Sequence, residues 1–326
     1  MAARVSSRQP ADTSREHFAS DVQYYLGLQP RQLPSRYFYD ALGSALFEAV
    51  CELPWYRVKR AELGLLAARG REIFDGVDHL STIVELGGGS GEKLVALVEA
   101  GRALSTRLDL HLIDVSRSAL AISARMLSTL DHVHLVTHEA TYETGLAEVA
   151  RERRAGGATL VLFLGSNIGN FDPPGAAAML TGIRGSLVRG DALLIGADLV
   201  KSERTLLLAY DDPLGVTAAF NRNLLVRINR ELDGDFDIDA FRHRAVWNGA
   251  ASRVEMHLVS ARRQTIRVGA ARLAFEMREG ETIWTESSYK YEPAGIVEML
   301  ARAGFSLVGQ WVDDVDRFAL TLVQAA

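Results

Sequence analysis

This 326-residue chain has little cysteine, no long apolar run and no excess of positive charge, and each of these absences excludes a class of protein. Its single cysteine, Cys51, rules out an internal disulfide framework and fits a reducing compartment such as the cytoplasm. No apolar run approaches the roughly 20 residues that cross a bilayer, and the opening segment MAARVSSRQPADTSREHF lacks the apolar core of a secretory signal. A net charge of −5 gives no electrostatic reason to bind nucleic acid or an anionic membrane. We therefore expect a cytoplasmic protein with neither partner, and a monomer because no long apolar stripe is left over.

Short apolar runs alternate with helical patterns between about residues 81 and 200. The five strand candidates are residues 82–87, 108–115, 132–139, 159–166 and 192–200. Nearly continuous apolar strands separated by helices of ten or more residues indicate a parallel sheet that is covered on both faces. Two further runs, residues 305–312 and 317–325, surround the turn DDVD and predict an antiparallel hairpin at the sheet edge. The sequence therefore predicts a doubly wound α/β sheet with an antiparallel C-terminal hairpin.

Residues 201–291 break this rhythm. The segment 209–232 reads as helix around a Pro-Gly interruption, and three alternating runs after residue 251 predict an antiparallel meander. The first 75 residues are mostly helical in pattern. We expect residues 1–60 and 201–286 to form one mixed α+β substrate-binding domain. Residues 61–200, completed by residues 287–326, should form the α/β core.

The segment ELGGGSGEK follows the first core strand and opens a helix. It places Glu85, Gly87, Gly89 and Gly91 in the order E-x-G-x-G-x-G. A dinucleotide-binding fingerprint would need a third glycine where Glu92 stands, and a carboxylate at a helix N-terminus would repel a pyrophosphate. This disfavours a nicotinamide-dependent oxidoreductase. The pattern resembles instead the first motif of class I S-adenosylmethionine-dependent methyltransferases, whose cofactor carries no phosphate.

Polar residues follow two of the other core strands. Asp114 ends the second strand, where a carboxylate can accept both hydroxyls of a ribose, although it could also cap the next helix. Asn167 and Asn170 lie in the glycine-broken turn LFLGSNIGNFDPP after the fourth strand, at the edge where such sheets bind ligands. The alternative for both asparagines is ordinary turn chemistry.

A series of motifs makes the resemblance more specific. In order they are FYDALGSALFEAVCELPWYRVKRAE, ELGGGSGEK, FLGSNIGNF, AYDDPLGVTAAFNRN, INRELDGDFDIDAF, RVEMHLV and TESSYKY. Over about residues 21–326 the chain resembles the L-histidine Nα-methyltransferase family of the ergothioneine pathway. That resemblance implies a class I methyltransferase fold with a substrate-binding domain. It also implies conversion of L-histidine to its trimethylated betaine, hercynine, with three molecules of S-adenosylmethionine and no metal.

The resemblance also implies which residues form the site. Its cofactor-binding positions are Glu85, Gly87, Gly89, Lys93, Asp114, Thr141 and Tyr142. Its substrate-binding positions are Tyr56, Asn170, Tyr210, Met256, Glu286 and Ser288, with Asn170 and Tyr39 nearest the reacting amine. Where the family carries an acidic-aromatic pair near the adenine, this chain has Thr141 and Tyr142, so the adenine amino group loses an expected acceptor, for which a backbone carbonyl or Glu139 could substitute.

Glu286 and Ser288 are two residues apart in the strand-like run TIWTESSYKY, so they should share a face. A neutral imidazole has one N–H donor and one acceptor nitrogen, which a carboxylate and a hydroxyl can satisfy together. Both residue types also occur on surface strands for solubility alone. Two other functions stay open: N-methylation of another amino acid or amine, and a catalytically silent S-adenosylmethionine-binding domain.

Three histidines, His132, His134 and His138, alternate along one predicted strand and could suggest a metal site. Their counterparts in the family are not ligands, so we expect no metal.

Overall fold

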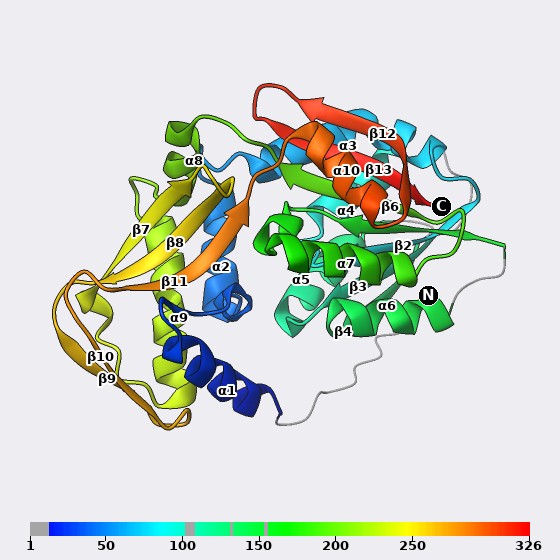
Figure 1. Ribbon diagram of the computed structural model, residues 1–326. Coiled ribbons are helices and arrows are strands. Elements are labelled where there is room, and N and C mark those ends of the chain that lie inside the picture. The colour runs from blue at the N-terminus through cyan, green and yellow to red at the C-terminus, as the bar shows by residue number, and fades with distance from the viewer. Residues whose placement is uncertain (1–12, 102–107, 131–132, 153–155) are drawn as a thin grey trace. The chain divides into compact units, whose positions relative to one another are not determined.

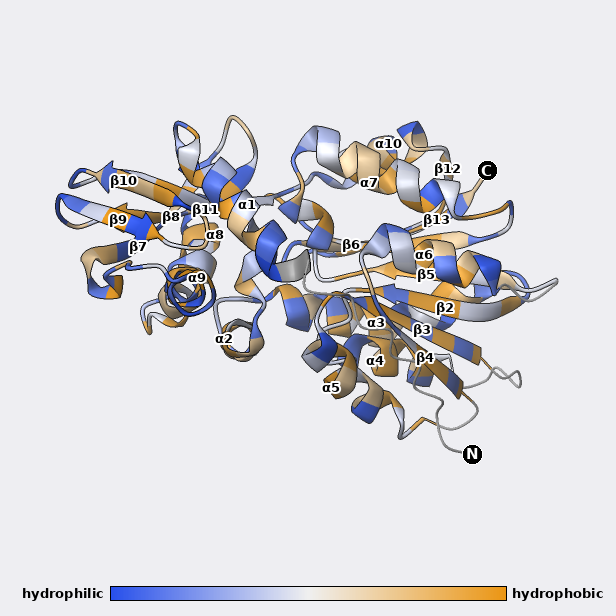
Figure 2. Cartoon of the chain, turned by 90° about the horizontal axis from the view of Figure 1, so that it is seen from below, coloured by the Kyte–Doolittle hydropathy of each residue, from blue (hydrophilic) through white to orange (hydrophobic). Residues whose placement is uncertain are grey.

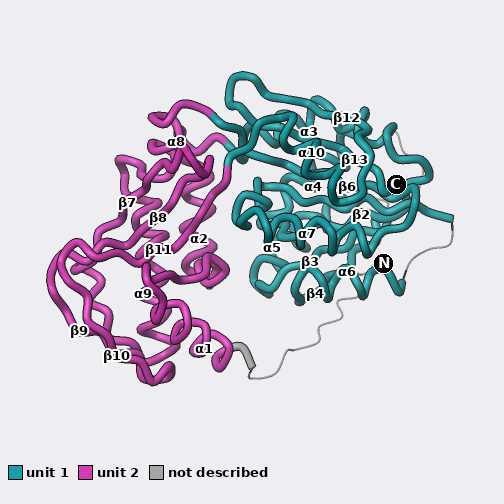
Figure 3. The backbone as a smooth tube through the Cα atoms, viewed as in Figure 1, with its two compact units in different colours: residues 1–8, 58–200, 290–326 teal, residues 9–57, 201–289 magenta. Residues whose placement is uncertain are grey.

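The computed structural model describes residues 13–101, 108–130, 133–152 and 156–326 (Figure 1). Its backbone divides into two compact units (Figure 3). Among the described residues, unit 1 comprises Val58–Val200 and Lys290–Ala326. Unit 2 comprises the part that precedes Val58 together with Lys201–Tyr289. The expected boundaries lay at residues 60, 200 and 286.

Unit 1 contains a seven-stranded sheet. Its strands are β2 (Leu80–Leu86), β3 (Leu108–Asp114), β4 (Val133–Glu139), β5 (Ala158–Phe163), β6 (Ala192–Asp198), β12 (Phe305–Asp313) and β13 (Phe318–Ala325). They lie in the order β12-β13-β6-β5-β2-β3-β4. Strands β2 to β6 are parallel, whereas β13 runs antiparallel to both β6 and β12. The predicted doubly wound sheet with its terminal hairpin is confirmed; the first residue of the run 132–139 lies outside the described residues.

Helices cover both faces of this sheet. They are α3 (Val58–Asp75), α4 (Glu92–Ala100), α5 (Arg117–Leu127), α6 (Tyr142–Arg151), α7 (Pro173–Gly185) and α10 (Pro293–Arg302). Figure 2 shows α6, α7 and α10 on one side and α3, α4 and α5 on the other, with mainly hydrophobic strands between them. Every residue of β5 and β6 is buried, as two covered faces require. Side chains of Ser116, Thr141 and Asp172 cap α5, α6 and α7.

Unit 2 combines helices with a smaller sheet. Its elements are α1 (Thr13–Gly27), β1 (Arg31–Gln32), η1 (Ser35–Phe38), α2 (Ala41–Cys51), α8 (Glu203–Tyr210), α9 (Val216–Leu232), η3 (Ile238–Ala240), β7 (Phe241–Asn248), β8 (Arg253–Ser260), β9 (Gln264–Val268), β10 (Leu273–Met277) and β11 (Thr282–Tyr289). Four strands pair in the order β1-β11-β8-β7, and β9 and β10 form a separate two-stranded sheet. Pro213 and Gly215 separate α8 from α9, as the sequence indicates.

The predicted meander is therefore partly wrong. The run 264–277 folds back on itself at Gly269–Arg272 to give the hairpin β9–β10, and Arg272 takes a positive φ of 47° in that turn. The place expected for this run belongs to β7, whose arginine-bearing sequence FRHRAVWN did not stand out as a strand.

One face of the four-stranded sheet packs against α8 and α9, and α2 packs on α9. Burial alternates along β8, where Val254, Met256 and Leu258 are 0–1% exposed. None of the helices within the described residues combines the length and apolar character needed to cross a membrane.

Candidate active site

The glycine loop after β2 is built for close approach. Gly87, Gly89 and Gly91 have φ values of +69°, +60° and +81°, a region that favours glycine. A Cβ on Gly87 would lie 2.5 Å from the hydroxyl oxygen of Tyr142 and 3.3 Å from Nδ2 of Asn167. The loop, the first residue of α6 and the turn after β5 therefore converge on one backbone position.

Glu85, near the end of β2, is a buried carboxylate at 1% exposure. Neither of its oxygens has a hydrogen-bond partner among the described residues. Burial raises the pKa of Glu85 to about 8; the charge of Lys93 opposes this rise, and Glu62 and Asp114 add to it. A buried acceptor without a donor is costly unless a ligand supplies one. The ammonium group of S-adenosylmethionine is such a donor, so this residue fits that cofactor.

Glu62 of α3, which the sequence did not single out, is fully buried. Its Oε2 lies 2.7 Å from Nζ of Lys93, and both of its oxygens lie 2.9 Å from the backbone nitrogen of Gly165. A Cβ on Gly196 would lie 1.9 Å from Oε1 of Glu62. The glycine inside the fully buried strand β6 was the one sequence signal for this carboxylate. Glu62 thus ties Lys93 to the start of the turn that carries Asn170.

Asp114 lies at the end of β3 and accepts a hydrogen bond from the backbone N–H of Ser116 at 2.7 Å. Burial raises the pKa of Asp114 against the effect of its backbone donors. The cap of α5 is Ser116, which accepts from Ala119, so the alternative that Asp114 caps this helix is wrong. Thr141 caps α6, and burial raises the pKa of Tyr142 beside it. Cofactor contacts by these residues stay predictions.

The turn after β5 carries both asparagines in η2 (Asn167–Asn170). Gly165 and Ser166 precede it with φ values of +76° and +57°. The left-handed conformation of Ser166 is held by its hydroxyl oxygen, which accepts the backbone N–H of Asp198 at 2.9 Å. Asn167 and Asn170 are half-buried at the carboxyl end of the sheet, as expected.

Three predicted tyrosines come together in unit 2. The ring of Phe47 lies 5.5 Å from that of Tyr39 and 6.1 Å from that of Tyr56, and Tyr56 lies 6.0 Å from Tyr210. All three contacts are edge-on. Phe220 of α9 packs on Tyr39 and Phe47. Phe47 and Phe220 were not predicted, because aromatic residues on helices usually fill a core.

Glu286 and Ser288 share a face of β11, as predicted. They pair with Met256 and Val254 of β8, which are two residues apart and each 1% exposed. The shared face is therefore the one covered by helices. Ser288 and Tyr210 are joined by a hydroxyl–hydroxyl hydrogen bond of 2.8 Å. The structure thus gathers Tyr210, Met256, Glu286 and Ser288 within unit 2.

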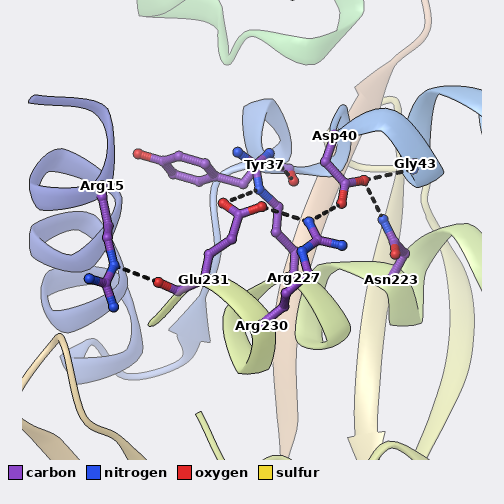
Figure 4. A network of polar contacts seen from close by, with 8 residues as sticks. All are labelled: Arg15, Tyr37, Asp40, Gly43, Asn223, Arg227, Arg230 and Glu231. Atoms are coloured by element: carbon purple, nitrogen blue, oxygen red, sulfur yellow. Dashed lines mark hydrogen bonds and ion pairs between the residues drawn. The ribbon is translucent and has the colours of Figure 1, made fainter. Parts of the chain in front are cut away.

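Asp40, which follows Tyr39, accepts hydrogen bonds from several residues of unit 2 (Figure 4). The carboxylate of Asp40 accepts from the backbone of Gly43 at 2.7 Å, from Nδ2 of Asn223 at 2.8 Å and from Arg230 at 2.6 Å. Burial would raise the pKa of Asp40, but these donors outweigh it and hold the pKa below its usual value. Asp40 is also the N-cap of α2, so it fixes the chain beside Tyr39.

The histidines of β4 form local contacts. His138 lies 3.0 Å from Nδ1 of His111 and 2.9 Å from Oε2 of Glu148, and His134 lies 3.3 Å from Asp109. His132 lies outside the described residues. Within the part of the chain that the structure describes, no group of three or more His, Cys, Asp or Glu residues is arranged to hold a metal ion.

Unit 1 has both the sheet and the glycine loop with which class I S-adenosylmethionine-dependent methyltransferases bind their cofactor, and the chain is an enzyme of that class. The model of the family described as "Histidine-specific methyltransferase, SAM-dependent" matches residues 18–325. The chain belongs to this family.

Relatives agree over nearly the whole chain. It is 41% identical to histidine N-alpha-methyltransferase of Mycobacterium tuberculosis (strain CDC 1551 / Oshkosh), over 98% of this chain and 99% of the relative. It is 39% identical to the protein of the same name from Mycolicibacterium smegmatis, over 96% of each. It is 27% identical to ergothioneine biosynthesis protein 1 of Neurospora crassa, over 86% of this chain and 32% of that longer protein.

Proposed function

We propose that the enzyme transfers three methyl groups from S-adenosylmethionine to the α-amino group of L-histidine and so makes hercynine for ergothioneine biosynthesis. The observation that carries the choice of substrate is the placement of Glu286 and Ser288 on one covered face beside Met256. Glu286 accepts the N–H of the neutral imidazole, and Ser288 donates to its other nitrogen. Met256 packs against the ring.

The hydrogen bond between Tyr210 and Ser288 supports the role of Ser288 as a donor to the imidazole. When Tyr210 donates to the hydroxyl oxygen of Ser288, the proton of Ser288 can be directed at the imidazole. A phenyl or indole ring cannot satisfy both groups. Leaving a buried acceptor unpaired costs about 1–3 kcal/mol, and more for a charged group, which disfavours tryptophan and phenylalanine.

The chemistry at the amine is mostly positioning. The α-amino group of a peptide titrates at about 8, and only the neutral form of an amine is nucleophilic. The amide oxygen of Asn170 orients that amine without charge, which suits a nitrogen that loses its hydrogens one by one. Tyr56 would help to hold the amino group, and Tyr39 would take part in removal of its proton.

When bound, S-adenosylmethionine supplies an electrophilic methyl group on a sulfonium. The residues of unit 1 that would hold it each have a distinct task. Gly87 and Gly89 allow the backbone to approach, and Lys93, itself held by Glu62, faces the carboxylate. Glu85 accepts from the ammonium group, and Asp114 accepts from the ribose hydroxyls. Thr141 and Tyr142 border the adenine.

Mass spectrometry of purified protein incubated with S-adenosylmethionine and L-histidine tests this proposal, with tryptophan and tyrosine in parallel. We expect histidine to gain three methyl groups and the other two to stay unmodified. Methylation of another amino acid alone would favour the second candidate, a related amino acid or amine N-methyltransferase. Absence of any transfer would indicate a silent binding domain. We also expect a monomer that acts in the cytoplasm without metal, which light scattering and assays with chelator can test.

A further inference from the structure

The pairing of β11 with β8 slips by one residue in front of Glu286. Trp284 pairs with His257, but Glu286 pairs with Met256, so Thr285 is an extra residue, or β-bulge. In a regular ladder Glu286 would lie opposite Glu255, on the other face of the sheet. This one residue therefore decides that Glu286 and Ser288 share the covered face.

Asn221 of α9 holds the bulge. It is fully buried, and its Oδ1 accepts a hydrogen bond of 2.7 Å from the hydroxyl of Thr285. Its Nδ2 lies 2.8 Å from Nδ1 of His243 on β7 and 3.3 Å from the carbonyl oxygen of His257 on β8. The hydroxyl of Thr285 also lies 3.0 Å from the carbonyl oxygen of Met256. One amide thus spans three strands at the row where the register slips.

Each hydrogen bond in this network can be assigned a donor and an acceptor. Burial lowers the pKa of His243, which favours the neutral form of its ring. Nε2 of His243 lies 2.8 Å from the carbonyl oxygen of Tyr210, which can only accept, so Nε2 carries the proton and Nδ1 accepts from Asn221. The amide oxygen of Asn221 therefore faces Thr285, which must donate to it. These hydrogen bonds connect the carbonyl oxygen of Tyr210 to the bulge, and the hydroxyl of Tyr210 is hydrogen-bonded to that of Ser288.

We propose that Asn221 and Thr285 are positioning residues for recognition of the imidazole. Both residues hold the bulge that places Glu286 and Ser288 on the same face as Met256, and neither touches the substrate itself. This inference rests on the proposed function, since it assigns a cause to the preference for histidine. It also gives a role to the segment FNRN of α9 and to the first residue of TESSYKY, neither of which belongs to the predicted site.

The test compares two substitutions at one position. Thr285→Val keeps the shape but removes the hydroxyl, whereas Thr285→Ser keeps the hydroxyl. Thr282→Val on the same strand, outside the bulge, is the matched control. We expect Thr285→Val to lower kcat/KM for histidine relative to tryptophan by about tenfold or more, mainly through KM, as loss of one well-placed hydrogen bond predicts. Thr285→Ser and Thr282→Val should keep the wild-type ratio.

Binding of S-adenosylhomocysteine, measured by calorimetry, separates this role from a general loss of folding. Its Kd should stay within about twofold of wild type in Thr285→Val, because a bulge in unit 2 acts on substrate recognition alone. The double variant Asn221→Ala/Thr285→Val should discriminate no worse than Asn221→Ala, since both residues act through one bond.

An unchanged substrate ratio in Thr285→Val would overturn the proposal while leaving histidine methylation intact. A parallel loss of cofactor binding and of turnover would overturn it too, because the residue would then serve only stability. If the wild-type protein does not methylate histidine, the proposed function fails and takes this inference with it.

Discussion

Glu85 shows how a single buried side chain makes the stability of the protein depend on pH. Burial raises the pKa of its carboxyl to about 8, above the ordinary value of 4.5 that applies to the unfolded chain. The folded protein therefore holds a proton that the unfolded chain releases between these two values. This contribution to stability is fully present below pH 4.5 and is lost as the pH rises toward 8.

We predict that the free energy of unfolding of the cofactor-free protein falls between about pH 4.5 and 8, and that it falls less in Glu85→Gln, which cannot ionise. Urea unfolding curves of both proteins at several pH values measure this difference. Identical pH dependence of stability in the two proteins would show that the pKa of Glu85 is not raised by folding.

Glu62 is the second residue whose effect reaches beyond its own position, because it holds Lys93 and the backbone of Gly165 together. We predict that Glu62→Gln destabilises the protein by about 1–3 kcal/mol, since the buried partner loses a charged hydrogen bond. We also expect weaker binding of S-adenosylhomocysteine.

Glu72→Gln on the same helix is the control, because that carboxylate is exposed and its loss should change stability by less than about 0.5 kcal/mol. Denaturant titration and calorimetry provide both quantities. Equal effects of the two substitutions would show that Glu62 has no special role.

At the level of elements, α2 begins at Asp40, whose carboxylate caps the helix and binds Asn223 and Arg230 of α9 (Figure 4). We predict that Asp40→Ala costs about 1–2 kcal/mol of stability, as loss of an N-cap does. Because Tyr39 precedes the cap, KM for histidine should rise while the Kd of S-adenosylhomocysteine stays constant.

Asp40→Asn keeps a capping oxygen and should recover much of the stability. Thermal unfolding together with steady-state kinetics measures both effects. If Asp40→Ala loses stability with no change in KM, Tyr39 does not depend on this cap.

The same scale shows which elements the sequence could reveal. Strands β5 and β6 were predictable because all their residues except Thr159 and Asp198 are apolar and both faces are covered. Strand β7 was missed because arginines occupy its exposed face, and the hairpin β9–β10 was merged into a meander because the turn at Arg272 carries no strong signal. The bulge at Thr285 was not predictable, since it depends on a hydrogen bond to a residue 64 positions away.

The site follows the same rule. Residues in the glycine loop and at strand ends could be found because local backbone needs fix them. Glu62 could not, because its partners Lys93 and Gly165 are brought to it only by folding. Phe47 and Phe220 look like any core aromatic until Tyr39 and Tyr56 are seen beside them.

For the whole molecule, the two units carry different parts of the work. The predicted cofactor residues belong to unit 1, and the groups proposed to read the imidazole belong to unit 2. This division implies that cofactor affinity and substrate preference can be changed separately by substitution. We therefore propose that the smaller sheet and its helices set the substrate preference of a methyltransferase core of common fold.

The most direct test of this account is the ratio of kcat/KM for histidine to that for tryptophan in the wild-type enzyme and in Glu286→Ala. We predict a strong preference for histidine in the wild type. In the variant this preference should fall by about ten- to a hundredfold, because a charged hydrogen bond to the imidazole is lost. The Kd of S-adenosylhomocysteine should be the same in the variant as in the wild type. A variant that still prefers histidine as strongly as the wild type would show that Glu286 does not read the imidazole, and would contradict the central claim.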